Sequence, residues 1–554
     1  MAGDVGRRLG ELAPRGDDLR AMGRSPRADI VAGLTVAVVA LPLALAFGVA
    51  SGLGAQAGLV TAIVAGVVAA VFGGSSVQVS GPTGAMTVVL VPVVHRFGPE
   101  GVLMVGFLAG LVLIAMSWAR VGGWVRYLPI SVVEGFTAGI AVVIALQQIP
   151  AALGVDATGE RVWRVAIDAA IEWVRAPDFG PPAVALGVAG LILVGVRWQP
   201  RWPVALIGLA AATAVASFGH LALARIGHLP DALPRPSFDF LTVDALGPLL
   251  WAALAVAALA ALESLLCASA ADSMTVDGHH DPDRELVGQG LANVVVPIFG
   301  GVPATAAIAR TAVNVRAGGV SRLSSVVHAM ALLAVILVAA PLFEAIPLAA
   351  LAGVLFATTV RMVELASLSV LLRSNRADAV VVLMTFAVTV LVDLISAVAI
   401  GLAVAVVLAL REVARNAQLE SVPLDRGEHG EEEHALLSQH IVAYRLDGPL
   451  VFAAARQMLL ELPDVVDVDF VIIRMSRVTA VDATGAAVLD DTIARLERRG
   501  IVVFLSGIKP RHEAILAALG VGEKLRREGR VFPNTVVAIA AARQLLAARR
   551  GSGA

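Results

Sequence analysis

One carboxylate lies inside a long apolar stretch of the sequence, and its position suggests ion chemistry. Glu263 occupies the middle of the apolar run 252–271. A carboxylate at the centre of a bilayer costs about 2.5 to 3.5 kcal/mol on insertion scales, so such a residue is a functional candidate by default. Bound Na+ or H+ would relieve this cost, and the Ser264 hydroxyl could join an oxygen shell around Na+. We predict that Glu263 and Ser264 hold a coupling ion; the alternative for Glu263 is a structural hydrogen bond.

Two matching motifs rich in Gly and Pro open apolar segments. They read SGPTGA at 80–85 and GVPATA at 301–306, and Pro82 and Pro303 are 221 residues apart. Pro in the first turn, with Gly beside it, exposes backbone N–H groups at a helix start that carries about half a positive charge. We predict a small anion between two half-helices that begin near these prolines. The alternative is that each motif only kinks an ordinary membrane helix.

The expected ligands of this anion are backbone groups and hydroxyls beside the two prolines, together with one arginine. Arg310 follows Pro303 by seven residues, which places it two turns along the same helix face. Arg310 could supply the counter-charge of the anion or pair with Glu263, and the two roles are compatible. The substrate-binding residues predicted from these motifs are Thr83, Gly84, Ala85, Ala304, Thr305, Ala306 and Arg310.

The same spacing relates a second pair of positions. Pro42, in the middle of the first apolar segment, maps onto Glu263 when 221 is added to its number. Transporters built from inverted repeats show short or broken hydrophobic segments at matching positions of their two halves. Two matched pairs at one spacing therefore predict two repeats.

The composition requires a membrane. Of the 554 residues 58% are hydrophobic and 16% charged, and residues 30–94 contain no Asp, Glu, Lys or Arg. Because one spanning helix needs about 20 apolar residues, several spans must follow one another. We expect a polytopic α-helical membrane protein with about 14 spans, arranged as 7+7 inverted repeats with broken third and tenth helices. The apolar segments are 30–49, 56–72, 79–94, 101–118, 128–149, 182–196, 203–223, 246–271, 286–299, 303–315, 324–342, 346–360, 378–392 and 394–410.

Arginines at the ends of these segments, such as Arg120, Arg197 and Arg411, predict an orientation in the cytoplasmic (inner) membrane with both termini cytoplasmic. From about residue 440, strand-like runs alternate with helical ones, which is typical of a small soluble α/β domain. The expected domains are a cytoplasmic N-terminal segment, a transmembrane transport domain, a linker and a cytoplasmic α/β domain, at 1–29, 30–415, 416–439 and 440–554.

Several function classes are disfavoured. The single cysteine, Cys267, excludes an intrachain disulfide, and a net charge of -2 with scattered basic residues gives no nucleic-acid surface. No cluster of His, Cys and carboxylates has metal-ligand spacing, and no phosphate-binding glycine loop occurs. We expect neither an enzyme nor a nucleic-acid binder, and no cofactor apart from Na+ or H+ as a coupling ion.

Longer motifs resemble one family. ALPLALAFGVASG at 40–52 and SGPTG at 80–84 look like the BicA-type bicarbonate transporters of the sulfate permease (SulP) family, whose members end in a STAS domain. GGVPATAAIARTAVN at 300–314 looks more like the sulfate and dicarboxylate branches of that family. The resemblance covers the whole chain.

This resemblance implies core and gate domains, an anion site between the third and tenth half-helices, an elevator-like movement and a homodimer. Phe47 would line the site, and Arg310 would be the arginine of the tenth helix. Glu263 falls at an acidic sodium ligand of BicA-type members, but Cys267 replaces the hydroxyl expected four residues later and is a poor ligand for a hard cation. Protons are therefore an alternative to Na+. Leu43 stands where many members have Gln.

The C-terminal domain contains VDATG at 481–485, which matches the turn that STAS-type regulators present for phosphorylation. The resemblance makes Thr484 the acceptor and implies a regulatory protein as partner of the STAS domain. The alternative is ordinary N-capping of the following helix by Asp482 or Thr484.

The predicted function is secondary active transport of a small inorganic anion, sulfate or bicarbonate, coupled to H+ or Na+ by an elevator mechanism. Membrane lipid, the anion and a second copy of the chain are the expected partners. The alternatives are a dicarboxylate or nucleobase permease of the same fold, and a membrane sensor that binds an anion and signals through the STAS domain.

Overall fold

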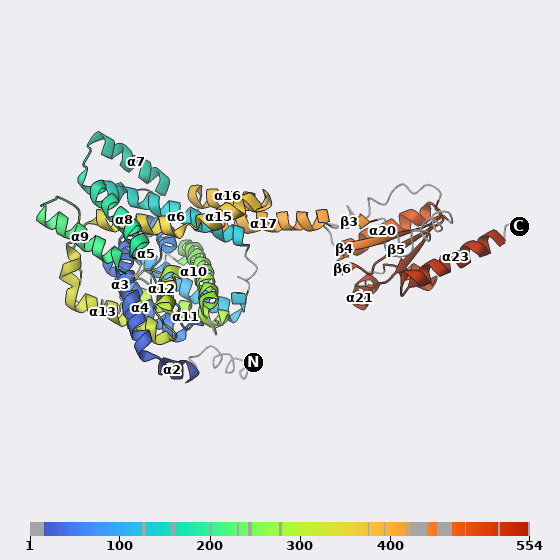
Figure 1. The fold of residues 1–554 in the computed structure, drawn as a ribbon, viewed down its shortest axis with the longest axis horizontal. Helices are drawn as coiled ribbons and strands as arrows, with labels where there is room; N and C mark the ends of the chain where they lie inside the picture. The colour runs from blue at the N-terminus through green and yellow to red at the C-terminus, as the bar shows by residue number, and fades with distance from the viewer. Residues whose placement is uncertain are drawn as a thin grey trace. The chain divides into compact units, whose positions relative to one another are not determined.

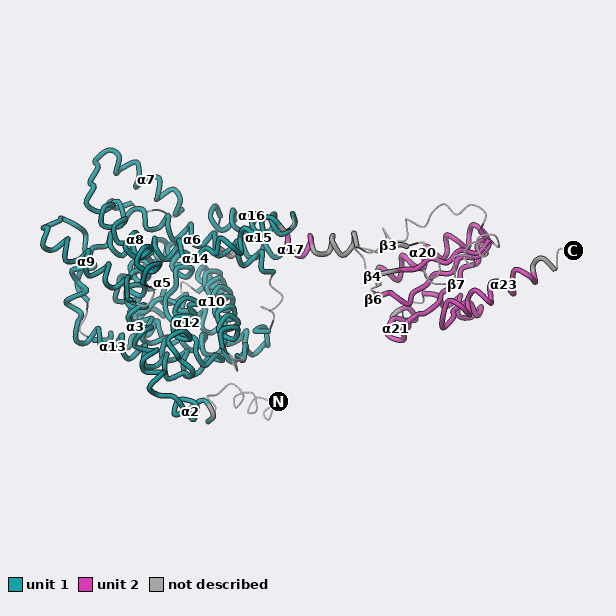
Figure 2. Tube along the Cα trace, viewed as in Figure 1, with its two compact units in different colours: residues 1–402 teal, residues 403–554 magenta. Residues whose placement is uncertain are grey.

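The computed structural model describes most of the chain as two compact units, 1–402 and 403–554, shown in different colours in Figure 2. The residues described are 16–123, 129–157, 159, 161–199, 202–229, 232–241, 246–275, 280–374, 376–392, 394–416, 418–420, 440–450, 468–481, 483–518 and 521–551. The expected linker lies largely outside them.

Helices form nearly all of the first unit (Figure 1), because a chain in lipid must satisfy its backbone hydrogen bonds internally. Before residue 240 they are α2 (Gly16–Met22), α3 (Pro26–Ala50), α4 (Ala55–Phe72), α5 (Gly84–Trp118), α6 (Ile130–Leu153), α7 (Val162–Arg175), α8 (Gly180–Trp198) and α9 (Val204–Phe218). After it come α10 (Leu246–Met274), α11 (Pro282–Val295), the 3-10 helix η3 (Val296–Phe299), α12 (Ile308–Arg316), α13 (Arg322–Glu344), α14 (Leu348–Met362), α15 (Leu365–Ser374), α16 (Arg376–Leu391) and α17 (Leu394–Asn416), which crosses the unit boundary.

Among the described residues, seven helices are long and apolar enough to cross a membrane, or eight if the bent pair α14 and α15 is one span. The polytopic helical fold is confirmed, whereas the count of 14 spans stays a prediction. The segments expected at 79–94 and 101–118 form one long helix, α5, interrupted at Gly98, whose φ of 71° breaks the helical conformation. Gly98 lies between the two expected segments, so α5 consists of two helices separated where the sequence predicts a break, with one residue in place of a loop.

Two short strands join the halves of the first unit. β1 (Ser80–Gly81) pairs antiparallel with β2 (Thr305–Ala306), with Ser80 opposite Ala306 and Gly81 opposite Thr305. Each strand is followed within three residues by a helix, α5 or α12. Because the strands run in opposite directions, the two helices leave the pair in opposite directions with their N-termini close together. The predicted pair of opposed broken helices is thus present.

The start of the second half-helix was expected near Pro303, and this is wrong by five residues. α12 begins at Ile308, after β2, whereas α5 begins at Gly84, two residues after Pro82. The helices begin 224 residues apart, not 221. The backbone after Pro303 is extended because it pairs with β1, so Arg310 is the third residue of its helix rather than two turns along it.

The second unit is an α/β domain. Its sheet has the order β3-β4-β5-β7-β8, with β6 also paired to β4, and every pairing except β3–β4 is parallel. Separate apolar clusters cover the two faces of the sheet, one with α20 and α21 and the other with α23. The elements are β3 (Gln418–Glu420), β4 (Ile441–Leu450), β5 (Phe470–Arg474), β6 (Val478–Val481), α20 (Ala483–Arg498), β7 (Val502–Ser506), α21 (Pro510–Ala518), α22 (Glu523–Arg527), β8 (Val531–Phe532) and α23 (Thr535–Gly551).

Candidate functional site

The N-termini of α5 and α12 form the centre of the candidate site. Their N-cap residues are Thr83 and Ala307, and neither side chain caps its helix. The first N–H groups of a helix have no partner within the helix. Two uncapped N-termini that face each other therefore offer N–H donors and partial positive charge to a small anion.

The backbone that leads into α12 is fixed by an asparagine. Asn293 Nδ2 donates to the Ala304 carbonyl at 2.8 Å, and the Ala304 N–H donates to Asn293 Oδ1 at 2.8 Å. Thr305 and Ala306 form β2, and the Ala307 N–H donates to the Val79 carbonyl at 3.0 Å. The structure thus places predicted ligands Ala304, Thr305 and Ala306 in the scaffold before α12, and the uncapped N–H groups belong to the residues that follow them.

Arg310 crosses from one half-helix to the other. Its side chain is buried, and Nη2 donates to the Pro82 carbonyl at 2.7 Å. Nη1 is buried without a hydrogen-bond partner among the described residues, and it lies so close to Gly81 that a Cβ there would be 2.5 Å away. The guanidinium therefore brings positive charge to the start of α5. Within the described chain Arg310 forms no ion pair with Glu263, so it is available as the counter-charge of an anion.

Glu263 touches the start of the opposite half-helix. Thr83 Oγ1 donates to Glu263 Oε2 at 3.0 Å, so this hydroxyl serves the carboxylate in the present structure. Ser264 Oγ donates to the Ala260 carbonyl and lies 3.3 Å from Thr305 Oγ1. The carboxylate and hydroxyls expected to hold a coupling ion therefore lie between α10, α5 and the strand before α12. An ion bound at Glu263 would act directly on the anion site.

Cys267 lies one turn beyond Glu263 on α10 and faces α12. Its thiol donates to Thr311 Oγ1 at 3.3 Å, and the same oxygen accepts the Val79 N–H at 3.1 Å. The position that could have added a hydroxyl near Glu263 thus holds a thiol engaged with another helix. A hard cation has one oxygen ligand fewer here than a serine or threonine would supply.

Phe47, Gly84 and Ala85 form the apolar side of the site. Phe47 and Ala85 are buried, and Gly84 packs so closely that a Cβ there would lie 3.1 Å from Phe47 Cε1. The aromatic ring therefore packs against the first turn of α5, and its role in lining an anion site stays a prediction. Leu43, one turn earlier on α3, is partly buried against the same core.

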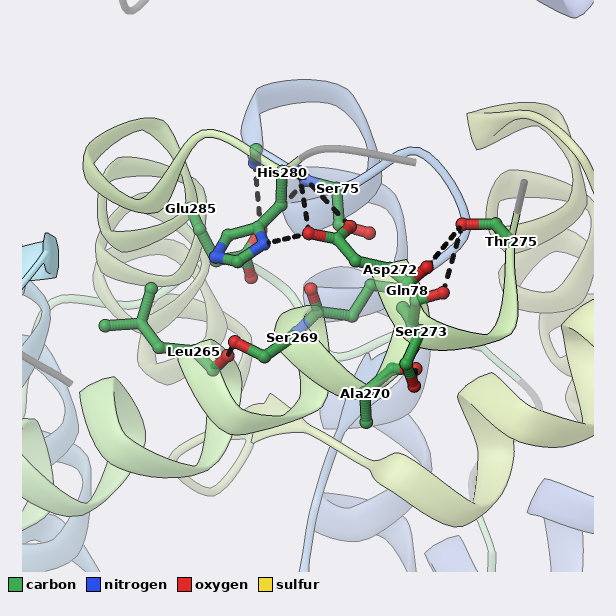
Figure 3. A network of polar contacts seen from close by, with 12 residues as sticks. Ser75, Gln78, Leu265, Ser269, Ala270, Asp272, Ser273, Thr275, His280 and Glu285 are labelled. Carbon is green, nitrogen blue, oxygen red and sulfur yellow. Dashed lines mark hydrogen bonds and ion pairs between the residues drawn. The ribbon is translucent and has the colours of Figure 1, made fainter. Parts of the chain in front are cut away.

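A polar network around the C-terminal half of α10 supports the extended chain before β1 (Figure 3). Glu285 Oε2 accepts the N–H groups of Gly74 and Ser75, and Gln78 Nε2 donates to the Ser264 carbonyl at 3.1 Å. At the end of α10, Asp272 pairs with the His280 ring at 2.7 Å and accepts its backbone N–H. The contacts of Glu285 and Gln78 tie the segment that leads to Pro82 to α11 and α10.

The sequence interpretation missed the supporting amides of α11. Gln289 Nε2 donates to Ser80 Oγ at 2.7 Å, and Asn293, one turn later, holds Ala304. Both are fully buried. Their spacing of four in an apolar segment places them on one helix face, and this signal could have identified them. The backbone of Thr484 is in the first turn of α20, and both its side chain and all of Asp482 lie outside the described residues.

Asn293→Ala is expected to destabilise the protein and weaken anion binding together. It leaves the N–H and carbonyl of Ala304 without a side-chain partner, and a buried unsatisfied group costs about 1 to 3 kcal/mol. Thermal unfolding in detergent, with and without the anion, measures both effects. Ser369→Ala is the control, because that exposed hydroxyl bonds only within its own helix. An unfolding temperature as high as that of the control would contradict a supporting role for Asn293.

Comparison with known proteins identifies relatives over nearly the whole chain. Residues 27–385 match the sulfate permease family, and residues 435–538 match the STAS domain. The chain is 36% identical to the Bacillus subtilis protein named "Putative sulfate transporter YvdB", over 90% of this chain and 95% of that one. It is 33% identical to the bicarbonate transporter BicA of Picosynechococcus, over 92% and 93% of the two chains.

Two solved structures share the fold. The transmembrane domain of a cyanobacterial bicarbonate transporter BicA superposes with a TM-score of 0.64 at 34% identity, covering 68% of this chain and 98% of that one. The murine Slc26a9 anion transporter in its inward-facing state superposes with a TM-score of 0.81 over 93% and 91% of the two chains, and at 18% identity this likeness shows the fold alone. The resemblance drawn from the motifs is confirmed.

Proposed function

Because the chain belongs to the sulfate permease family and ends in a STAS domain, we propose that it is a secondary active transporter of a small inorganic anion, sulfate or bicarbonate. The single observation that carries this proposal is the convergence of two uncapped helix N-termini and the buried guanidinium of Arg310. N–H donors and one cation suit a compact oxyanion. The relatives named for sulfate and for bicarbonate transport support both substrates.

Coupling is assigned in this proposal to Glu263. Its carboxylate accepts a hydrogen bond from Thr83, the N-cap of α5. Gain or loss of the charge on Glu263 therefore changes the electrostatic environment at the start of α5, where we propose that the anion binds. We favour H+ as the coupling ion, because Cys267 faces Thr311 and adds no oxygen ligand for Na+. Sodium coupling is the other outcome of the experiment below.

Movement is proposed to occur between two groups of helices. A core group, α3–α5 with α10–α13, makes most of its contacts internally, and so does a gate group of α6, α8, α14 and α16. The residues of the candidate site described above belong to the core group or to the strands β1 and β2 and the short segments beside them that lead into α5 and α12. An elevator-like displacement of the core group would carry the bound anion as one body past the gate group.

The decisive experiment is uptake into proteoliposomes that contain the purified full chain. Labelled sulfate, bicarbonate, a dicarboxylate and a nucleobase are tested singly, each with a pH gradient, a Na+ gradient or neither. Uphill uptake of an inorganic anion driven by pH is the expected result. Uptake of only a dicarboxylate or only a nucleobase would show that the protein is a permease for that class of solute. Binding of an anion without transport of any solute would favour the alternative of a membrane sensor.

The remaining parts of the proposal concern assembly and placement. We propose a homodimer in the cytoplasmic membrane with both termini in the cytoplasm, where a regulatory protein could reach the STAS domain. The positive-inside distribution of arginines supports this orientation. Mass measurement of the detergent-solubilised protein tests the dimer, and protease access to terminal tags in sealed vesicles tests the orientation.

A further inference from the structure

A cleft of about 350 Å³ opens where α3 and α6 end and α14 begins. The residues that line it include Val49 and Ala50 of α3, Val91 of α5, and Gln147 and Gln148 of α6. None of them belongs to the candidate site. Three of the helices that line the cleft, α3, α5 and α6, nevertheless also contribute residues around the N-terminus of α5.

On each of these helices the cleft residue shares a face with a residue closer to the candidate site, because positions three, four or seven apart lie on one side of a helix. The pairs are Ala50 with Phe47, Val91 with Gly84, and Gln147 with Ile144. At 1.5 Å per residue, the deeper member is about 5 to 10 Å farther along its helix. Phe47, Gly84 and Ile144 therefore lie one to two helical turns deeper than the residues that line the cleft.

Phe47 and Ile144 both pack against Gly84. A Cβ at Gly84 would overlap Ile144 Cδ1 and would lie 3.1 Å from Phe47 Cε1. Ile144 is 2% exposed and Phe47 is 7% exposed, so little solvent reaches this point. Ile144 belongs to the gate group, whereas Phe47 and Gly84 belong to the core group. Ile144 and Gly84 therefore leave no gap between the core group and the gate group on the side that faces the cleft.

The cleft itself is partly polar. Gln147 Oε1 and Nε2 are both buried and have no hydrogen-bond partner in the described part of the chain. A buried amide needs polar partners, and its N–H donors and carbonyl acceptor can serve water or an entering oxyanion. Gln147 in the cleft and Ile144 beside Gly84 are therefore only one helical turn apart on α6.

We propose that the cleft is the entrance to the anion site on its side of the membrane, and that Ile144 seals this entrance by packing against Gly84. The inference rests on the proposed transport of a small oxyanion. An apolar constriction blocks hydrated ions by excluding water, and separation of α6 from α5 would break the seal. Glycine at position 84 allows the closure, because any side chain there would occupy the place of the Ile144 δ-methyl.

Reaction of introduced cysteines tests the seal without requiring transport. In a Cys267→Ser background the only thiol is the introduced one, since the chain has a single cysteine. His95→Cys reports the cleft above the seal, because His95 lines the cleft and is exposed, and Ala85→Cys reports the first turn of α5 below it. A charged, membrane-impermeant thiol reagent is applied separately to each face of sealed vesicles that contain the full chain.

With Ile144 intact, we expect His95→Cys to react from one face and Ala85→Cys to be protected from that face. Ile144→Ala should increase the reaction rate of Ala85→Cys from the same face at least tenfold, and Ile144→Val, which removes only the δ-methyl, should give a smaller increase. Ile130→Ala, a matched change at an exposed position of α6, should have no effect.

Equal labelling of Ala85→Cys from that face with and without Ile144 would overturn the proposal. So would continued protection in both Ile144 variants while His95→Cys in the same backgrounds still reacts, which also shows that the variants are folded. If the labelling test fails while anion uptake is normal, the seal at Ile144 is contradicted and the transport proposal stands. If the labelling result is as expected but no anion is taken up, the seal stands and the transport proposal is contradicted.

Discussion

We expect Glu263→Gln to abolish uphill accumulation of the anion while leaving the protein folded. The amide oxygen can still accept the hydrogen bond from Thr83, which is 3.0 Å from the carboxylate in the structure. The amide cannot release or bind a proton in the physiological range, and it is a weaker ligand for a cation. Binding of the anion should survive, because the helix N-termini and Arg310 are unchanged.

The measurement is accumulation of labelled anion against its gradient in proteoliposomes, compared with anion binding to the same preparation. Glu134→Gln is a matched control, because Glu134 also accepts a side-chain hydrogen bond, from Ser367 at 2.8 Å, but lies in the gate group. Undiminished uphill uptake by Glu263→Gln would remove this residue from coupling. Equal losses in both variants would indicate damage to the fold rather than to coupling.

We expect Arg310→Ala to weaken anion binding by roughly ten- to a hundredfold, because a hydrogen bond to a charged group contributes about 1.5 to 3 kcal/mol. The substitution also removes the donor that holds the Pro82 carbonyl at 2.7 Å, so the start of α5 loses support. Equilibrium binding of labelled anion to purified protein gives the affinity, and gel filtration monitors folding.

Two variants separate the anion contact from general charge effects. Arg316→Ala removes an exposed arginine at the other end of α12 and should leave the affinity unchanged. Arg310→Lys keeps the charge but loses the forked geometry that can bond Pro82 and an anion together, so we expect an intermediate affinity. Unchanged affinity in Arg310→Ala would exclude the guanidinium from the site.

Much of this site could be predicted from the sequence because its residues break simple rules for membrane helices. Pro82 and Pro303 interrupt apolar segments, and Glu263 places a charge in one. Helix-breaking residues and charges are costly in lipid, so they mark functional positions without any knowledge of the fold. The family, the helical membrane fold and the α/β domain were likewise predicted and are confirmed.

The local register could not be predicted, because it depends on contacts between distant segments. Nothing near Pro303 indicates that Thr305 will pair with Gly81, and this pairing delays the start of α12 to Ile308. The partners of Thr83 and Arg310 likewise lie on distant segments, 180 and 228 residues away. Propensity and spacing describe one helix at a time, whereas these interactions depend on how several helices pack.

The β1–β2 pair also constrains how the protein is made. Gly81 and its partner Thr305 are 224 residues apart, and at about 5 to 20 residues per second the ribosome needs roughly 10 to 45 s to span that distance. During this interval the backbone of β1 has no strand to pair with, although unpaired backbone groups are costly in lipid. The backbone groups of β1 must therefore be shielded from lipid during this interval by water, by the helices of the first half or by an insertion factor. The two half-helices can assemble only after the second half has been synthesised.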